Sequence, residues 1–325
     1  MGNRALRVRV GFASAAAVAL AVGIAACGGG GGSSTVSEAQ SNLIHSNPAN
    51  RKTTITVGSK NFTESVILGQ IYAQAFRAAG YKVRTRLDLG SEKVALKAIE
   101  DGQISGYPEY TSTALGSFFR VPANKIPSDP TQAYDEAKAD LAKDRIVAYP
   151  PTPFADSNAV GTLTTTAERL GLKDVSDLTG KSQKLVLAGS PECRRRFDCL
   201  AGLEQNYGLR FKQFKPVAIG RRYTVLDNGD ADLSILFTSD AQLAASTRYT
   251  ILNDDKGLIP AGNAIFIVSK KVADQAGPDL GATIENVQSN MTLPVIQELN
   301  SRVDIQGEDP AAVAHQYLKS LGYVR

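Results

Sequence analysis

Hydrophobic and polar positions from residue 54 onward repeat in the order of short strands and amphipathic helices. Apolar residues at spacings of three to four mark helices, and alternation marks strands. The predicted elements are a strand at 55–57, a helix at 62–79, a strand at 83–89, a helix at 91–102 and a strand at 104–108. Gly80 and Gly102 end the two helices, and Ser91 can cap the second. This β-α-β-α-β order predicts a parallel sheet with helices on both faces.

A second unit is predicted after the proline-rich segment 150–154. Its strands are expected at 158–163, 185–188, 233–237 and 250–252, followed by a break at 258–260, a strand at 264–268 and helices over 281–323. Pro130, Pro294 and Pro310 lie where helices can begin. Two breaks predict an α/β fold in which lobe II (155–259) is inserted into lobe I (54–154 with 260–325). The two crossovers would form a hinge, with a ligand cleft between the lobes.

The N-terminus has the pattern of an export signal. Three arginines precede the uncharged run 10–26, whose length of about 17 residues is marginal for a permanent membrane span of roughly 20. The run ends in Ile24-Ala25-Ala26-Cys27, which resembles the bacterial lipobox. We therefore predict a lipoprotein signal peptide at 1–26 and acylation of Cys27, which would anchor an exported protein to the outer face of the bacterial cell membrane. The alternative is ordinary secretion, in which Cys27 has no part. The Gly/Ser-rich segment 27–53 is expected to be a flexible tether.

Composition excludes several classes of function. The 325 residues are 43% hydrophobic and 21% charged, which excludes a wholly disordered chain. Of the 36 basic residues, three lie in the predicted signal peptide, and the remaining 33 are nearly balanced by 32 acidic residues. Nucleic-acid binding therefore has no electrostatic support. Two histidines and three cysteines leave little material for a metal site, and no cofactor is expected.

Catalytic motifs are nearly absent. No nucleophile elbow, zinc-protease motif or phosphate loop occurs, and His45 and His315 have no nucleophile beside them in the sequence. Glu109 is the one acid–base candidate near the predicted cleft. Cys193 and Cys199, six residues apart in an exported chain, favour a disulfide of about 2 kcal/mol over a redox-active pair. The sequence therefore predicts no enzyme.

Two segments directly follow predicted strands and carry groups suited to a zwitterion. Residues 58–64, Gly-Ser-Lys-Asn-Phe-Thr-Glu, open a helix and offer main-chain amides and the Lys60 ammonium to an anion. Residues 107–113, Tyr-Pro-Glu-Tyr-Thr-Ser-Thr, add the Tyr110 ring and the Thr113 hydroxyl. A quaternary ammonium has no N–H to donate, so aromatic faces must bind it. Each tyrosine could instead be a packing residue.

The sequence resembles the glycine betaine/choline-type substrate-binding proteins of osmoprotectant ABC transporters. The resemblance extends over 54–325 and is carried by five motifs: 59–64, 107–113, Arg196-Phe197-Asp198, Asn206-Tyr207-Gly208 and Asn253-Asp254-Asp255-Lys256. It implies a type II periplasmic-binding-protein fold of two Rossmann-like lobes. It also implies a monomer that delivers a small molecule to an ABC permease without chemistry on the ligand.

The resemblance assigns the two ends of the ligand to different residues. Lys60, Thr113 and Arg196 match positions that hold the ligand carboxylate. The family's cation box is built from four tyrosines, whose places here are taken by Tyr110, Asn158, Phe237 and Ala261. Two rings are thus missing, which removes about 1–4 kcal/mol at about 0.5–2 kcal/mol per cation–π contact. Three other aromatic residues are candidates to compensate: Tyr107, Phe154 and Tyr223.

These observations lead to one function and three alternatives. The first expectation is a lipid-anchored binding protein that captures glycine betaine, choline or a related quaternary amine by lobe closure. The second has the same transport role with a bulkier, less cationic ligand, aromatic or hydroxylated, because two rings are absent. The third is an enzyme on the same scaffold, and the fourth is a sensory or adhesion lipoprotein without a transporter.

Overall fold

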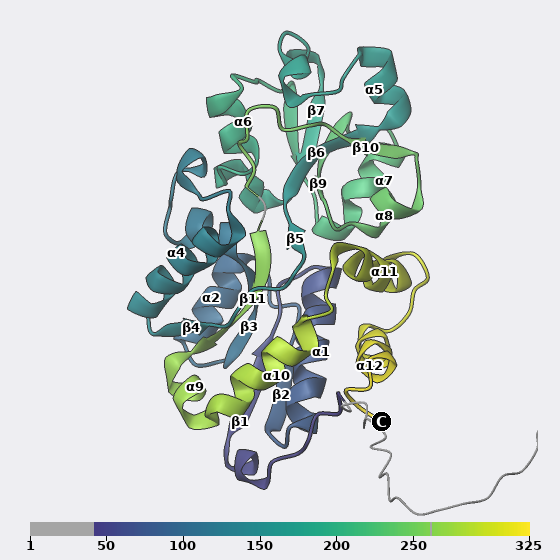
Figure 1. Ribbon diagram of the computed structural model, residues 1–325. Coiled ribbons are helices and arrows are strands. Elements are labelled where there is room, and N and C mark those ends of the chain that lie inside the picture. Colours follow the sequence, from purple (N-terminus) through teal and green to yellow (C-terminus); the bar gives the residue numbers. More distant parts are fainter. Residues whose placement is uncertain (1–41, 261) are drawn as a thin grey trace, which may run out of the picture. The chain divides into compact units, whose positions relative to one another are not determined.

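The computed structural model describes residues 42–260 and 262–325, in which strands and helices alternate (Figure 1). The strands are β1 (Thr54–Gly58), β2 (Lys82–Arg86), β3 (Gly106–Tyr110), β4 (Ile146–Ala148), β5 (Ala155–Asp156), β6 (Asn158–Leu163), β7 (Val186–Gly189), β8 (Gln213–Pro216), β9 (Leu233–Phe237), β10 (Tyr249–Ile251) and β11 (Gly262–Ser269). The predicted signal peptide, Cys27, most of the predicted tether and Ala261 lie outside the described residues.

The helices predicted at 62–79, 91–102 and over 281–323 are present, and the structure adds others between residues 111 and 276. The α-helices are α1 (Thr63–Ala78), α2 (Glu92–Glu100), α3 (Thr111–Thr113), α4 (Pro130–Lys143), α5 (Thr164–Leu170), α6 (Leu200–Asn206), α7 (Arg222–Asp227), α8 (Ala241–Ala245), α9 (Lys270–Ala276), α10 (Pro278–Gln288), α11 (Leu293–Asp304) and α12 (Pro310–Ser320). Shorter helical turns include η2 (Ala114–Phe118) and η6 (Pro191–Arg195). Pro130, Pro294 and Pro310 lie in the first turns of α4, α11 and α12, as predicted.

The first sheet has the strand order β2-β1-β3-β11-β4 and is mixed. β1 runs parallel to β2 and β3, as the β-α-β-α-β pattern predicts. The prediction of a parallel sheet is wrong for β11, which is antiparallel to both β3 and β4. The reason is that β11 follows the return crossover and enters the sheet from its opposite end.

The second sheet has the order β10-β6-β9-β7-β8. β6 is antiparallel to β9 and β10, whereas β7 is parallel to β8 and β9. The predicted strands of this sheet match β6 and β9 at both ends and β7 and β10 within one residue. The sequence did not predict β8, an edge strand whose residues are exposed or half-buried.

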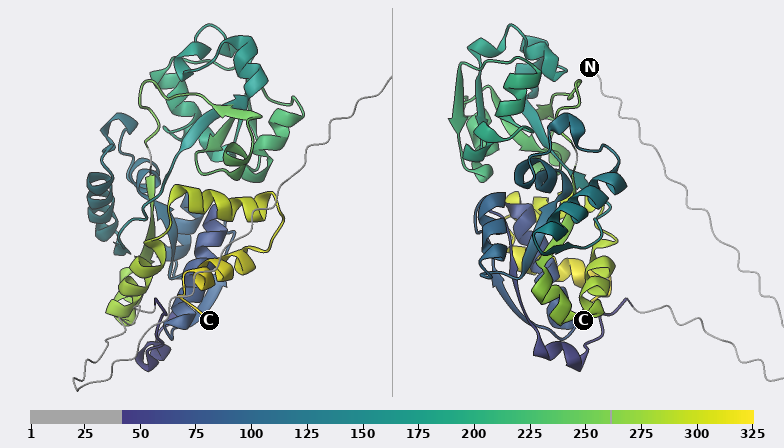
Figure 2. Two further views of the ribbon diagram at one scale, coloured as in Figure 1. Left: turned by 45° about the vertical axis from the view of Figure 1, so that its right-hand side comes forward. Right: turned by 90° about the vertical axis from the view of Figure 1, so that its left-hand side faces the viewer.

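The two crossovers between the sheets lie side by side and are hydrogen-bonded to each other. In β5 and β11, Asp156 pairs with Gly262 and Ala155 pairs with Asn263 (Figures 1 and 2). Gly262 has no room for a side chain, since a Cβ there would lie 2.2 Å from the Ser112 hydroxyl. The Asn263 amide donates to the Thr152 carbonyl at 2.9 Å and fixes the crossover from the other side.

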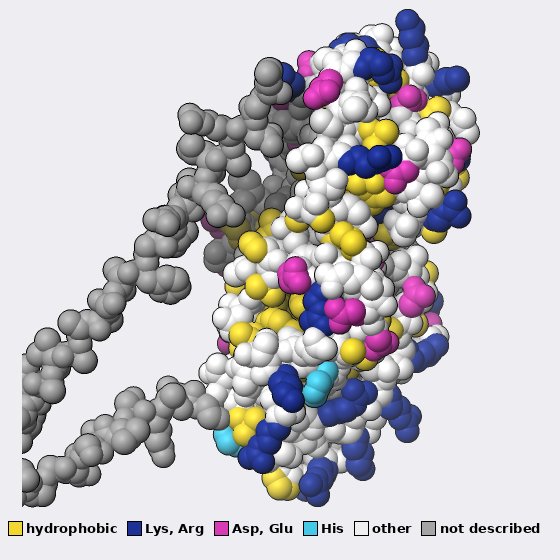
Figure 3. All heavy atoms as spheres, turned by 90° about the vertical axis from the view of Figure 1, so that its right-hand side faces the viewer, with side chains coloured by type: hydrophobic (Ala, Val, Ile, Leu, Met, Phe, Trp, Pro, Cys, Tyr) yellow, Lys and Arg dark blue, Asp and Glu magenta, His cyan; other side chains and the backbone are white. Residues whose placement is uncertain are grey.

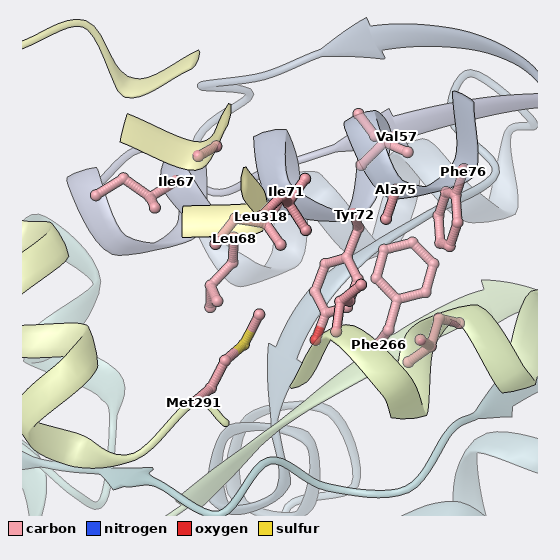
Figure 4. Close-up of a cluster of buried hydrophobic side chains, with 14 of the residues drawn as sticks. Val57, Ile67, Leu68, Ile71, Tyr72, Ala75, Phe76, Phe266, Met291 and Leu318 are labelled. Atoms are coloured by element: carbon pink, nitrogen blue, oxygen red, sulfur yellow. The ribbon is translucent and has the colours of Figure 1, made fainter. Parts of the chain in front are cut away.

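The core of the first lobe lies between β1, β11 and the helices of the C-terminal region. Apolar side chains of α1 meet Phe266 of β11 and Met291 and Leu318 of the C-terminal segment (Figure 4). Tyr72 of α1 packs on Phe266 with ring centroids 4.7 Å apart. A separate apolar cluster around Leu187, Leu203 and Leu233 forms the core of the second lobe. Each sheet thus has a core of its own, and the ends of its strands can contribute to a common site.

Both histidines, His45 and His315, are exposed, and Figure 3 shows two histidine side chains at the surface. Neither lines the cavity described below. Among residues 42–260 and 262–325, no helix has both the length and the apolar composition needed to span a bilayer.

Candidate functional site

A cavity of about 70 Å³ is lined by residues of both lobes. It receives Lys60, Tyr110 and Thr113 from the first sheet's side, and Asn158, Arg196 and Phe237 from the second. Six of the seven ligand-binding residues predicted from the sequence therefore meet at one place. The seventh, Ala261, lies outside the described residues.

Lys60 is held at the cavity wall by a buried ion pair. The turn after β1 places its main-chain N–H against the Ser65 hydroxyl at 2.9 Å, and its ammonium group pairs with Glu109. Glu109 is fully buried at the end of β3 and also accepts a hydrogen bond from the Tyr107 hydroxyl at 2.9 Å. Glu109, the acid–base candidate of the sequence, does not line the cavity. Its contacts make it the counter-ion that positions Lys60.

Arg196 belongs to a loop closed by the Cys193–Cys199 disulfide. Its guanidinium donates to Asp198 at 2.8 Å and lies 3.6 Å from Glu92 at the start of α2. Burial opposes the Arg196 charge, but the two carboxylates outweigh it and raise the pKa of Arg196. Arg196 therefore links the two lobes through Glu92 and keeps its positive charge at the cavity.

Three aromatic rings form one side of the cavity. Phe62 lies between Tyr110, at a centroid distance of 6.3 Å, and Phe237, at 5.4 Å. All three rings already have a cation of the protein nearby, since the Lys60 ammonium lies 5.5 Å from the Phe62 centroid. The Lys60 ammonium lies 4.5 Å from the Tyr110 centroid, and the Arg222 guanidinium lies 3.8 Å from that of Phe237.

The other candidate aromatics of the sequence do not line this cavity. Tyr107 is fully buried on Glu109, and Phe154 belongs to the first core. The Tyr223 hydroxyl donates to Asp240, and its ring packs on Tyr249. Phe62 was not predicted as a lining ring, although it lies in the motif 59–64 that carries the family resemblance.

Buried acids approach the cavity beside the rings. Asp156 of β5 lines it and accepts hydrogen bonds from the Thr238 hydroxyl at 2.9 Å and the Ser239 main-chain N–H at 3.0 Å. Burial, followed by the charges of Glu64 and Asp240, raises the pKa of Asp156 to about 7. Asp156 is therefore a carboxyl group that can carry either charge state near neutral pH.

Glu64 extends this acidic group behind the rings. It accepts hydrogen bonds from the Tyr110 hydroxyl and, at 3.0 Å, from the Asn300 amide of α11. Burial raises the pKa of Glu64 above its usual value. Asn300 also donates to the Ser239 carbonyl at 3.1 Å. The ring wall is thus connected through Glu64 and α11 to the turn that follows β9.

A metal site is not evident in the part of the chain that the structure describes. No group of three or more histidine, cysteine, aspartate or glutamate side chains there is arranged to hold a metal ion.

A comparison with protein families and a comparison with individual proteins agree with each other. Residues 53–320 match the family described as the substrate-binding domain of ABC-type glycine betaine transport systems. A glycine-betaine-binding protein of Pseudomonas aeruginosa is 31% identical over 277 residues, covering 82% of this chain and 87% of the relative. The glycine betaine-binding protein YehZ of Escherichia coli is 26% identical over 290 residues, covering 86% and 94%.

A solved structure supports the same fold. The crystal structure of a glycine betaine/carnitine/choline ABC transporter matches with a TM-score of 0.64 at 24% identity, covering 82% of this chain and 98% of that one. Together with the two sheets described above, this similarity confirms the predicted two-lobed α/β fold of type II periplasmic binding proteins.

Proposed function

Since the chain belongs to the family of substrate-binding domains of ABC-type glycine betaine transport systems, we propose that its own ligand is an osmoprotectant such as glycine betaine or choline. The ligand would enter the cavity between the lobes and stabilise a closed form, which a membrane permease then recognises. Proteins of this family bind and deliver a ligand, and no catalytic step is part of the proposal.

The observation that carries the proposal is that one cavity is lined by both kinds of group that a zwitterion needs. Phe62, Tyr110 and Phe237 offer ring faces and edges, and Asp156 adds negative charge for a cation. Lys60 and Arg196 provide positive charge for a carboxylate. In the proposed complex the ligand carboxylate shares these two cations with their internal partners, and the Thr113 hydroxyl donates a further hydrogen bond.

The proposal places the protein outside the cell, tethered to the membrane. It rests on the predicted signal peptide at 1–26, the lipobox-like Ile24–Cys27 and the Gly/Ser-rich segment 27–53. Acylation of Cys27 would hold a monomer near its permease while the tether lets the lobes move. The lobe boundaries proposed from the sequence, 154/155 and 259/260, lie beside the paired crossovers.

A second candidate is the same transport role with a bulkier, less cationic ligand. Three contacts favour it. Asn158 takes the place of a ring, and its amide donates to the Asp198 carbonyl at 3.1 Å. Lys60 and Arg222 lie close to the Tyr110 and Phe237 rings, which a quaternary amine would need. A ligand stacked on the rings would tolerate these cations better than an ammonium group would.

Calorimetric titration of the full chain, purified in detergent, tests both candidates. We expect micromolar binding of glycine betaine, choline, carnitine or proline betaine, weakened at least tenfold by Tyr110→Ala because a lining ring is lost. Tyr249→Ala, which removes a ring outside the cavity, is the control and should bind normally. Absence of binding by all four compounds to a cooperatively folded protein would contradict the osmoprotectant and leave the bulkier ligand.

Restoring a ring at position 158 should strengthen ligand binding, whereas Tyr110→Ala should weaken it. Asn158→Tyr should tighten choline binding roughly tenfold, because one more cation–π contact contributes about 0.5–2 kcal/mol. Asn158→Leu removes the same hydrogen bond without adding a ring. It therefore separates the effect of the added ring on affinity from the effect of the lost amide. Titration of choline into both variants gives the answer, and equal affinities would show that position 158 does not contact the cation.

A further inference from the structure

A second and larger cavity adjoins the ligand cavity. It has a volume of about 660 Å³ and shares six lining residues with the first: Ser91, Glu92, Ser112, Glu192, Arg196 and Asp198. The shared residues form a boundary that both cavities touch. A ligand longer than glycine betaine could therefore extend from one cavity into the other.

The two cavities differ in charge. The first is lined by three basic side chains and four acidic ones, so its formal charge is −1. The second is lined by five basic side chains, Lys93, Arg120, Arg194, Arg195 and Arg196, and by three acidic ones, so its formal charge is +2. Three aromatic rings line the first cavity, and one, Phe197, lines the second. Each cavity thus suits one end of a zwitterion.

Four of the five basic side chains of the second cavity are available to a ligand. Lys93, Arg120 and Arg195 are exposed and make no hydrogen bond or ion pair within the described part of the chain. Arg194 lies on the Phe214 ring at 4.7 Å and has no acidic partner among the described residues. Two of the three acids, Glu92 and Asp198, already interact with Arg196. Unpaired arginines of this kind are suited to phosphate or carboxylate oxygens.

The segments that carry these arginines are conformationally constrained. Arg120 has a φ of +57°, in the left-handed region that side chains other than glycine rarely adopt. Arg194 and Arg195 end η6, inside the loop closed by the Cys193–Cys199 disulfide. Arg120 comes from the first lobe and Arg195 from the second, so an anion held by both would bridge the lobes.

We propose that the preferred ligand is a zwitterion with widely separated charges: a quaternary amine, held in the ring-lined cavity, joined by a spacer to an anionic group held by Arg120 and Arg195. A choline phosphate ester has this chemistry, whereas glycine betaine has only one carbon between its ammonium nitrogen and its carboxylate. The inference rests on the proposed function, because the ring-lined cavity must accept the amine.

The test compares phosphocholine with choline and glycine betaine by calorimetric titration of the full chain in detergent. Phosphocholine should bind at least tenfold more tightly than choline. The double variant Arg120→Ala/Arg195→Ala should lose this advantage and leave choline binding within twofold. Arg84→Ala, at an exposed basic position on β2 outside both cavities, is the control and should change neither affinity. Higher ionic strength should weaken phosphocholine binding more than choline binding.

The outcomes separate this inference from the proposed function. If choline binds and phosphocholine binds no more tightly, the inference is overturned and the osmoprotectant function stands. A phosphocholine advantage that survives the double variant also overturns it. If neither choline nor glycine betaine binds while phosphocholine does, the short osmoprotectant is contradicted and the long zwitterion is supported. If none of the three binds to folded protein, both proposals fail.

Discussion

Glu109→Gln is expected to lower the free energy of unfolding by about 3–5 kcal/mol, the cost of leaving one partner of a buried ion pair uncompensated. Glu109 is fully buried and Lys60 is only 6% exposed, so water cannot replace the lost carboxylate. The substitution also weakens the acceptor for the Tyr107 hydroxyl and the Tyr110 main-chain N–H. Urea denaturation, monitored by circular dichroism, measures the change.

Two further variants separate the charge effect from packing. Lys60→Met/Glu109→Gln removes both charges and should be more stable than Glu109→Gln alone, since no unpaired ammonium remains. Glu298→Gln, at an exposed position of α11, makes the same chemical change in water and should alter stability by less than about 0.5 kcal/mol. A loss below about 1 kcal/mol for Glu109→Gln would mean that the ion pair is not held as described.

The ligand-free protein should lose stability as the pH rises from about 4 to about 7, because of Asp156. The folded protein holds a proton on Asp156 up to a pKa of about 7, whereas the unfolded chain releases it near 4. Between these values the unfolded state binds fewer protons, so the free energy of unfolding falls with increasing pH. The difference corresponds to about 4 kcal/mol at most.

The groups that face Asp156 set its pKa and therefore the size of this loss of stability. Glu64 of α1 and Asp240 before α8 raise its pKa, while the Thr238 hydroxyl and Ser239 N–H lower it. Asp240 is itself paired with Arg222 at 2.8 Å. Asp156→Asn should flatten the stability profile between pH 5 and pH 8, as measured by urea denaturation. Asp135→Asn, at an exposed site on α4, should leave the profile unchanged. A wild-type profile that rises with pH over this range would contradict the prediction.

Ligand binding should show the complementary trend. A quaternary ammonium beside Asp156 favours the ionised carboxylate, so affinity for choline should increase from pH 6 to pH 8 in the wild-type protein and stay flat in Asp156→Asn. Ligand binding thus offsets the loss of stability that ionisation of Asp156 causes. A flat wild-type profile would show that the cation binds away from β5.

Buried strands and helix ends were predictable from the sequence because their signals are local. β6 and β9 are largely buried apolar runs, and both were placed correctly at each end. Gly80 and Gly102 follow the ends of α1 and α2 with positive φ, as the breaks in periodicity predict. These features depend on residues within one or two turns, and no distant partner is needed to form them.

Features that depend on distant partners were not predicted. The antiparallel direction of β11 depends on how the chain returns after about a hundred residues, and β4, β5 and β8 are too short to show periodicity. The same limit applies within the site. The motifs named Lys60 and Arg196, but only the fold shows that Glu109 and Asp198 neutralise them. Which acids surround a cation is a property of packed elements rather than of a motif.

Because β5 pairs with β11, the segment that forms the second lobe could be exchanged as one piece between related genes during evolution. Asp156 and Gly262 face each other in register, so the segment between them leaves and re-enters the first lobe at a single place. Recombination between related genes could replace that segment by joining two neighbouring points, without disturbing either core. Since each lobe contributes both an aromatic ring and a cation to the cavity, one such exchange would change both ends of the ligand site together. New ligand preferences could then arise in single steps.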